Sequence, residues 1–221
     1  MFAGHLGVAM LFKRADPKIN LGALFLAVLL LDVLLWTFIL LGIEAASAPF
    51  DFQSRHYMTF FFPYSHGLLT SFLWALLAGF VGYVLWQGPA ASQRNTALVL
   101  SLAVFSHFIL DYLVHIPELP VAGPDSYRLG LGLWNHLPWA LGLEASLAVL
   151  GTILWWRSTT LNFTRKSLLV LLMVLVTGMT VAGQWLQTSP PKPHAMAIAS
   201  LVTIFLLCLA GAGLDRKPMP Q

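Results

Sequence analysis

The chain has little charge and almost no cysteine. Of its 221 residues, 10% are charged and 58% are hydrophobic, whereas a soluble globular protein carries about 25% charged residues. This deficit excludes an ordinary soluble domain and indicates an integral membrane protein. The single cysteine, Cys208, excludes an intrachain disulfide. The net charge of +3 is small and most basic residues flank apolar segments, so no nucleic-acid partner is expected.

The sequence contains several long apolar segments. A membrane-spanning helix needs about 20 predominantly apolar residues. Six segments meet this requirement: 19–43, 66–87, 96–115, 137–157, 167–186 and 195–213. The sequence therefore predicts an all-α polytopic membrane helix bundle of about six spans, with one integral domain over residues 1–221. Polar groups fall within 19–157, so we expect the site there and a scaffold role for 167–213.

The N-terminal region needs a separate interpretation. Residues 1–12 are apolar but too short to span, so they predict an interfacial helix or a re-entrant half-helix. A re-entrant helix would bring His5 toward mid-membrane, and its buried amino end would favour anions. The run 19–43 is longer than the roughly 7–15 residues of a cleavable signal segment and contains Asp32. We therefore predict a retained spanning helix.

Basic residues are distributed unequally between the two sides of the predicted bundle. The side of the N-terminus holds Lys13, Arg14, Lys18, Arg94, Arg157, Arg165, Lys166, Arg216 and Lys217. The opposite side holds Arg55, Arg128 and Lys192. The positive-inside rule therefore predicts a cell-membrane protein with both termini in the cytoplasm. The long loops 44–65 and 116–136 should then face outward.

Acids and imidazoles interrupt the predicted spans. His107, Asp111 and His115 follow one another at intervals of four, which places them on one face of a helix. A charged side chain at the centre of a membrane helix costs about 2.5–3.5 kcal/mol even on a lenient scale. Such groups therefore face the bundle interior, paired or bound, and the same holds for Asp32 and Glu144. We expect them to line one outward-open cavity between the first four spans.

Clustered His and Asp residues favour a borderline metal such as zinc. Asp111 can share an ion with His107 or with His115, but these two histidines are about 12 Å apart along the helix axis and should not share one easily. His66 lies at the outer rim, near enough to join. A bound ion would lower the pKa of its water toward ~7, and Glu144 or Glu44 would then serve as general base.

The chain resembles the YdjM-like family of membrane-bound metal-dependent hydrolases over residues 1 to about 115. Four elements carry the resemblance, and they are Gly4-His5, Asp32 in Leu31-Asp32-Val33, Ser65-His66, and Ser106-His107 followed by Asp111. The chain departs from the family pattern at Leu34, where a second Asp is usual. It departs again at Phe60-Phe61, where the family has a His-Arg pair.

The resemblance implies a metal site that includes His5 as well as Asp32, His66, His107 and Asp111. It also implies remote kinship to zinc-dependent phospholipase C and the P1-type nucleases, which cleave phosphoesters. We therefore expect hydrolysis of a phosphoester or lipid-linked substrate at the outer leaflet, with membrane lipids as partners.

Three alternatives stay open from the sequence. Chains of Asp, Glu and His also form proton relays in ion-coupled transporters. Two facing histidines can hold haem in an electron carrier. A non-catalytic membrane subunit is the third alternative.

Overall fold

Five long apolar helices dominate the computed structural model, which describes residues 1–216. Lys217, counted above among the basic residues, lies outside the described residues. The five are α5 (Leu68–Leu85), α6 (Ala90–Val114), α7 (Leu137–Ser158), α8 (Phe163–Leu186) and α9 (Pro193–Leu214). Each is long and apolar enough to cross a membrane. The bent pair α2 (Leu21–Val28) and α3 (Leu30–Leu40) is apolar enough to count as a sixth crossing if its two halves form one span. The predicted all-α bundle of about six spans is confirmed.

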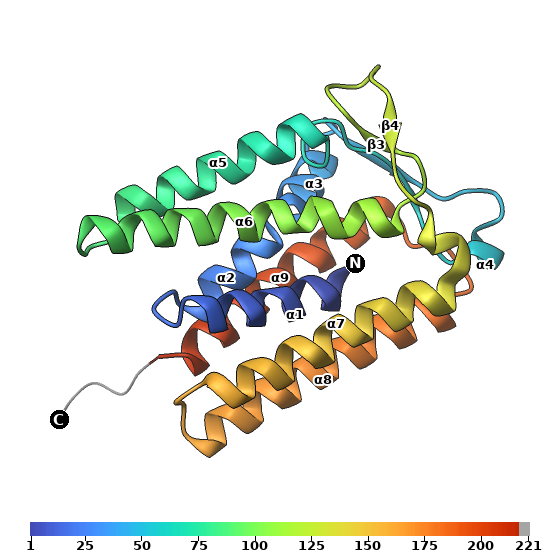
Figure 1. Ribbon diagram of the computed structural model, residues 1–221. Helices are drawn as coiled ribbons and strands as arrows, with labels where there is room; N and C mark the ends of the chain where they lie inside the picture. Colours follow the sequence, from blue (N-terminus) through green and yellow to red (C-terminus); the bar gives the residue numbers. More distant parts are fainter. Residues whose placement is uncertain (217–221) are drawn as a thin grey trace.

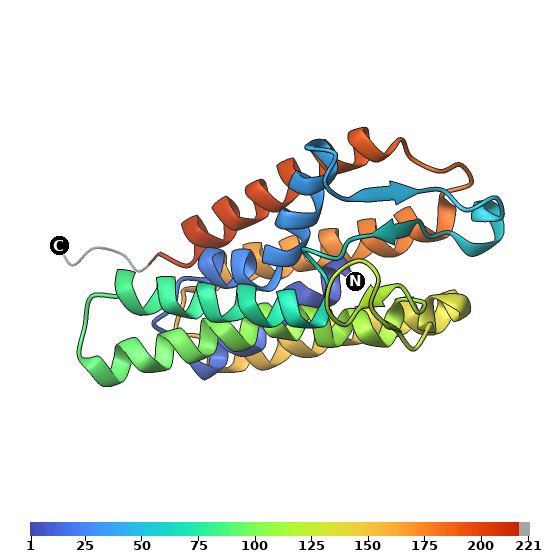
Figure 2. The same cartoon turned by 90° about the horizontal axis from the view of Figure 1, so that it is seen from above.

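The broken sixth crossing differs from the continuous span predicted over 19–43. Its two halves meet at Leu29 at an angle of 57°. The residues at the break, Val28, Leu29 and Leu30, are all aliphatic, so no glycine or proline marks it in the sequence. Figure 2 shows α2 and α3 lying between α9 and the α5–α6 pair. Irregular backbone is tolerated at membrane depth where protein surrounds it, and this packing surrounds the break.

Helix α1 (Phe2–Ala15) lies inside the bundle, and its amino end is at the middle of the molecule (Figure 1). Its 14 residues are about 21 Å long, too short for a hydrocarbon core of about 30 Å. It is therefore a half-helix within the bundle and not an interfacial one. It crosses α7 so closely that a Cβ on Gly151 would lie 2.1 Å from the Gly7 carbonyl oxygen. Only glycine permits this approach, which fixes α1 against α7.

The two long loops meet at one end of the bundle (Figure 1). The first holds β1 (Ala45–Ser47), α4 (Phe52–Arg55) and β2 (Thr59–Phe61), with β1 antiparallel to β2. The second holds β3 (Leu119–Pro120), β4 (Arg128–Leu129) and the 3₁₀-helix η1 (Leu133–His136). A carboxylate oxygen of Glu118 accepts a hydrogen bond from the Phe60 amide at 2.8 Å and joins the two loops. Together they cover the end of the bundle where the polar side chains gather.

Candidate metal centre

One carboxylate oxygen lies at the centre of the polar cluster. The Nε2 atoms of His107, His66 and His115 lie 3.1, 3.5 and 3.7 Å from Oδ2 of Asp111. All four residues are buried. The ligand atoms of one zinc ion, each about 2.0–2.2 Å from the metal, lie roughly 3–4 Å from each other. The separations among Nε2 of His66, Nε2 of His107 and Oδ2 of Asp111 therefore suit ligands of one divalent ion.

Two further residues complete the cluster from other helices. Oδ1 of Asp32, in the first turn of α3, lies 3.8 Å from both His66 Nε2 and His107 Nε2. Nε2 of His5, on α1, lies 3.2 Å from the other Asp111 oxygen, and its ring stacks on His107 with centroids 3.8 Å apart. Two groups of three ligands can be drawn from these residues, with the ligand atoms of each within 4.8 Å of one another. They are His5 with His107 and Asp111, and Asp32 with His66 and His107.

His107 and His115 both reach Asp111, although the rise of the helix separates them by about 12 Å along the axis. His115 is the residue at which α6 ends, and its backbone is extended. Helical side chains lean toward the amino end of their helix, and the ring of His115 accordingly lies over Asp111, one turn back. Both rings therefore contact Asp111, but neither of the two three-ligand groups contains His115.

Hydrogen bonds behind two of the rings fix their tautomers. Nδ1 of His107 donates to the Val28 carbonyl oxygen at 2.6 Å. Val28 is the last residue of α2, and the helix break leaves its carbonyl free for this bond, since the last carbonyls of a helix lack partners within it. Nδ1 of His115 donates to Oε1 of Glu118 at 2.7 Å. When each ring is neutral, its hydrogen is on Nδ1 and its Nε2 is free to bind a metal ion.

His66 is held by a two-step relay. Its Nδ1 lies 2.8 Å from Oγ of Ser65, and that hydroxyl lies 2.6 Å from Oε2 of Glu44. With Glu44 ionised, the Ser65 proton goes to the carboxylate, so the hydroxyl accepts from Nδ1 of His66. Burial raises the pKa of Glu44, while the hydrogen bonds from Ser65 and Tyr64 oppose the rise. When His66 is neutral, this relay places its hydrogen on Nδ1 and leaves Nε2 free to bind a metal ion.

Nitrogen atoms of three imidazoles thus approach one carboxylate oxygen, and a metal ion bound there would be held by neutral rings that present Nε2. Histidine ligands of metal ions characteristically donate their other ring N–H to a carboxylate, carbonyl or water, which orients the ring. Ser65, the Val28 carbonyl and Glu118 fill that role here, and the sequence analysis assigned none of them to the site. The sequence could have indicated this role for two of them, since Ser65 directly precedes His66 and Glu118 follows His115 by three residues.

The two carboxylates expected as general bases lie outside the centre of the cluster. Oε1 of Glu144 accepts from the amides of Ala3 and Gly4 at 2.7 and 3.4 Å. It therefore satisfies the exposed N–H groups at the amino end of α1, where negative charge is favoured. Glu44 accepts from the Tyr64 and Ser65 amides at 2.8 and 2.9 Å and stands behind His66. Both carboxylates orient other parts of the site.

Comparisons of the chain with protein-family models, with curated protein sequences and with solved structures gave no match. The class of protein is therefore inferred from the fold and the site alone. The chain has the helices of a multi-pass membrane protein. Within them lies a buried His/Asp group that could hold a metal ion.

Proposed function

We propose that the protein is a membrane-embedded, metal-dependent hydrolase, with zinc as the metal. The observation that carries the proposal is the approach of three Nε2 atoms, from His66, His107 and His115, to Oδ2 of Asp111. Such a set of nitrogen and oxygen ligands matches the preference of zinc. When bound, the ion supplies hydroxide near neutral pH by lowering the pKa of its water to ~7.

Asp32 gives the site its direction of access. Its side chain is 19% exposed, whereas those of His66 and Asp111 are at most 3% exposed. We assign Asp32 to the open side, where it holds a water molecule and accepts its proton. His5 supports Asp111 from the closed side through its 3.2 Å contact and its stacking on His107.

The resemblance to the YdjM-like hydrolases supports the reaction type. It favours a phosphoester, and the membrane location favours one carried on a lipid or lipid-linked substrate. The loops that cover this end of the bundle are those that the positive-inside rule assigns to the outer face. The substrate would therefore enter from the outer leaflet.

An ion-coupled transporter is a second candidate, and the broken crossing favours it. Discontinuous helices that meet near the middle of the membrane form the ion sites of many transporters. Here the break at Leu29 lies three residues before Asp32. Uptake of zinc or protons into liposomes that depends on Asp32, without hydrolysis, would favour this candidate.

Metal analysis and hydrolysis assays test the main proposal together. We expect protein purified in a mild detergent to contain about one zinc ion per chain and to cleave a phosphodiester probe such as bis(p-nitrophenyl) phosphate. Asp111→Asn and His107→Ala should lose both the zinc and the activity. His194→Ala and Asp125→Asn change exposed residues outside the cluster and serve as matched controls. Wild-type protein that retains no metal after reconstitution with zinc would refute the proposal.

A further inference from the structure

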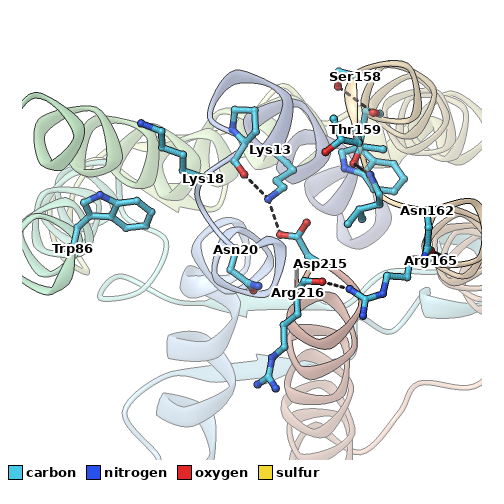
Figure 3. Close-up of a pocket in the computed structure, with 14 residues that line it drawn as sticks. Lys13, Lys18, Asn20, Trp86, Ser158, Thr159, Asn162, Arg165, Asp215 and Arg216 are labelled. Atoms are coloured by element: carbon cyan, nitrogen blue, oxygen red, sulfur yellow. Dashed lines mark hydrogen bonds and ion pairs between the residues drawn. The ribbon is translucent and has the colours of Figure 1, made fainter. Parts of the chain in front are cut away.

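A cavity with basic residues on its wall lies at the opposite end of α1 from the histidine cluster. It has a volume of about 990 Å³ and lies where α1, α7, α8 and α9 end or begin (Figure 3). Lys13 on its wall follows His5 by eight residues, about 12 Å along α1. The cavity is therefore separate from the candidate metal centre. It lies on the side that the positive-inside rule assigns to the cytoplasm.

The wall of this cavity carries an excess of positive charge. Its charged lining residues are Lys13, Lys18, Arg165, Asp215 and Arg216. The only acid among them is already neutralised, because Oδ2 of Asp215 accepts from Lys13 Nζ at 2.6 Å and from the Leu21 amide at 2.8 Å. Within the described residues, no carboxylate forms an ion pair with the other three cations.

A buried donor without an acceptor provides independent evidence for a ligand. Trp155 lines the cavity and is 1% exposed, yet its indole N–H has no hydrogen-bond partner among residues 1–216. An indole nitrogen only donates, and a buried donor that finds no acceptor is costly. A ligand in the cavity that offers a hydrogen-bond acceptor would satisfy this N–H group.

Further donors surround the same space. One guanidinium nitrogen of Arg165 donates to the Arg216 carbonyl oxygen, and its other N–H groups remain for a ligand (Figure 3). The side-chain oxygen of Asn162 accepts from the Arg165 amide at 3.0 Å, which leaves its NH₂ group free to donate. A ligand with several acceptor oxygens and negative charge would satisfy these groups together.

We propose that this cavity binds a phosphate-bearing anion. Phosphate offers acceptor oxygens in the geometry that arginine binds best. Two sources share this chemistry, and they are the headgroup of an anionic phospholipid and a free phosphate compound. Anionic lipids attract basic residues at the cytoplasmic surface of a membrane, so the location suits the headgroup, while the volume also admits a free ligand.

Indole NMR of the detergent-purified full chain tests the proposal. Protein labelled with ¹⁵N-tryptophan is titrated in one arm with inorganic phosphate and in the other with bicelles of phosphatidylglycerol, using phosphatidylcholine as reference. The Trp155 signal is identified by its loss in Trp155→Phe. We expect it to shift in at least one arm. A shift with phosphatidylglycerol alone identifies a headgroup site, whereas a shift with inorganic phosphate identifies a site for free ligands.

Variants distinguish this cavity from the general basic surface. Lys18→Gln changes an exposed loop residue and Arg165→Gln a partly exposed one, so both should fold. Each should weaken binding by about tenfold, the loss expected for one hydrogen bond to a charged group. Arg157→Gln is the matched control, because Arg157 is basic, exposed and outside the cavity lining. The proposal is overturned if neither ligand shifts the Trp155 signal, or if Arg157→Gln weakens binding as much as the cavity variants.

Discussion

Nε2 of His66 and Nε2 of His107 lie 3.2 Å apart, and when both rings are neutral and donate from Nδ1, neither of these nitrogens carries a proton. Two lone pairs at this separation repel each other. A cation between them turns the repulsion into coordination, so ion binding and folding are coupled at this point.

Removal of the metal should therefore lower the stability of the folded chain. A ligand present at 100 times its dissociation constant stabilises a protein by about 2.7 kcal/mol. We expect a chelator to lower the melting temperature by several degrees, measured from tryptophan fluorescence in detergent. Asp111→Asn should melt at the same temperature with and without chelator. An equal shift in this variant would place the ion elsewhere.

Substitutions of Asp111 and of Asp32 should have different effects on metal retention and on hydrolytic activity. Oδ2 of Asp111 is approached by three imidazoles within 3.7 Å, whereas Asp32 is 3.8 Å from two of them and is partly exposed. Asp111→Asn should abolish metal retention. Asp32→Asn should retain metal with weaker affinity and lose most of the hydrolytic activity. Zinc content and turnover, measured on the same samples, check this order, and the reverse order would contradict it.

The relay behind His66 should affect the metal from a distance. Ser65→Ala removes the acceptor that keeps the His66 proton on Nδ1. Loss of such supporting hydrogen bonds typically costs about 10–100-fold in metal affinity. Competition with a fluorescent zinc chelator measures it. Ser106→Ala is the matched control, because Ser106 precedes His107 but donates only to the Ala103 carbonyl within α6. Equal affinity in both variants would show that the relay has no role.

Close packing of α1 against α7 should not tolerate a side chain at Gly151. A Cβ there would lie 2.1 Å from the Gly7 carbonyl oxygen. Forcing an extra methyl group into a packed interior costs about 1–3 kcal/mol. We expect Gly151→Ala to lower the melting temperature and to reduce metal retention, because α1 carries His5.

Gly142→Ala is the control for this substitution on the same helix. A Cβ at Gly142 would meet no heavy atom within 4 Å. Alanine is favoured over glycine inside a helix by about 1 kcal/mol, so this variant should be at least as stable as the wild type. A Gly151→Ala protein as stable as Gly142→Ala would contradict the close crossing.

The spans were predictable because lipid imposes a strong requirement on length and apolarity. Predicted limits such as 137–157 agree closely with α7 at Leu137–Ser158. The break at Leu29 was not predictable, since the residues around it are aliphatic and only packing against other helices defines it. Hydropathy reports the free-energy cost of exposing a side chain to lipid. It does not report a bend of the helix axis that is caused by packing against other helices.

The polar cluster was partly predictable by the same physical rule. Charged groups such as Asp32 and Asp111 cannot remain in lipid unpaired, and the structure brings both to the same histidines. The roles of Glu44, Glu118 and Glu144 were not predictable, because each depends on which backbone amide or ring lies opposite. Such partners come from segments up to 141 residues apart in the sequence.

The burial of α1 has a consequence for biogenesis. This helix is too short to be retained in the bilayer as a span of its own, and the carboxylate that receives its amino end, Glu144, is synthesised 141 residues after Ala3. The amino end of α1 therefore gains this carboxylate partner only after α7 has been synthesised.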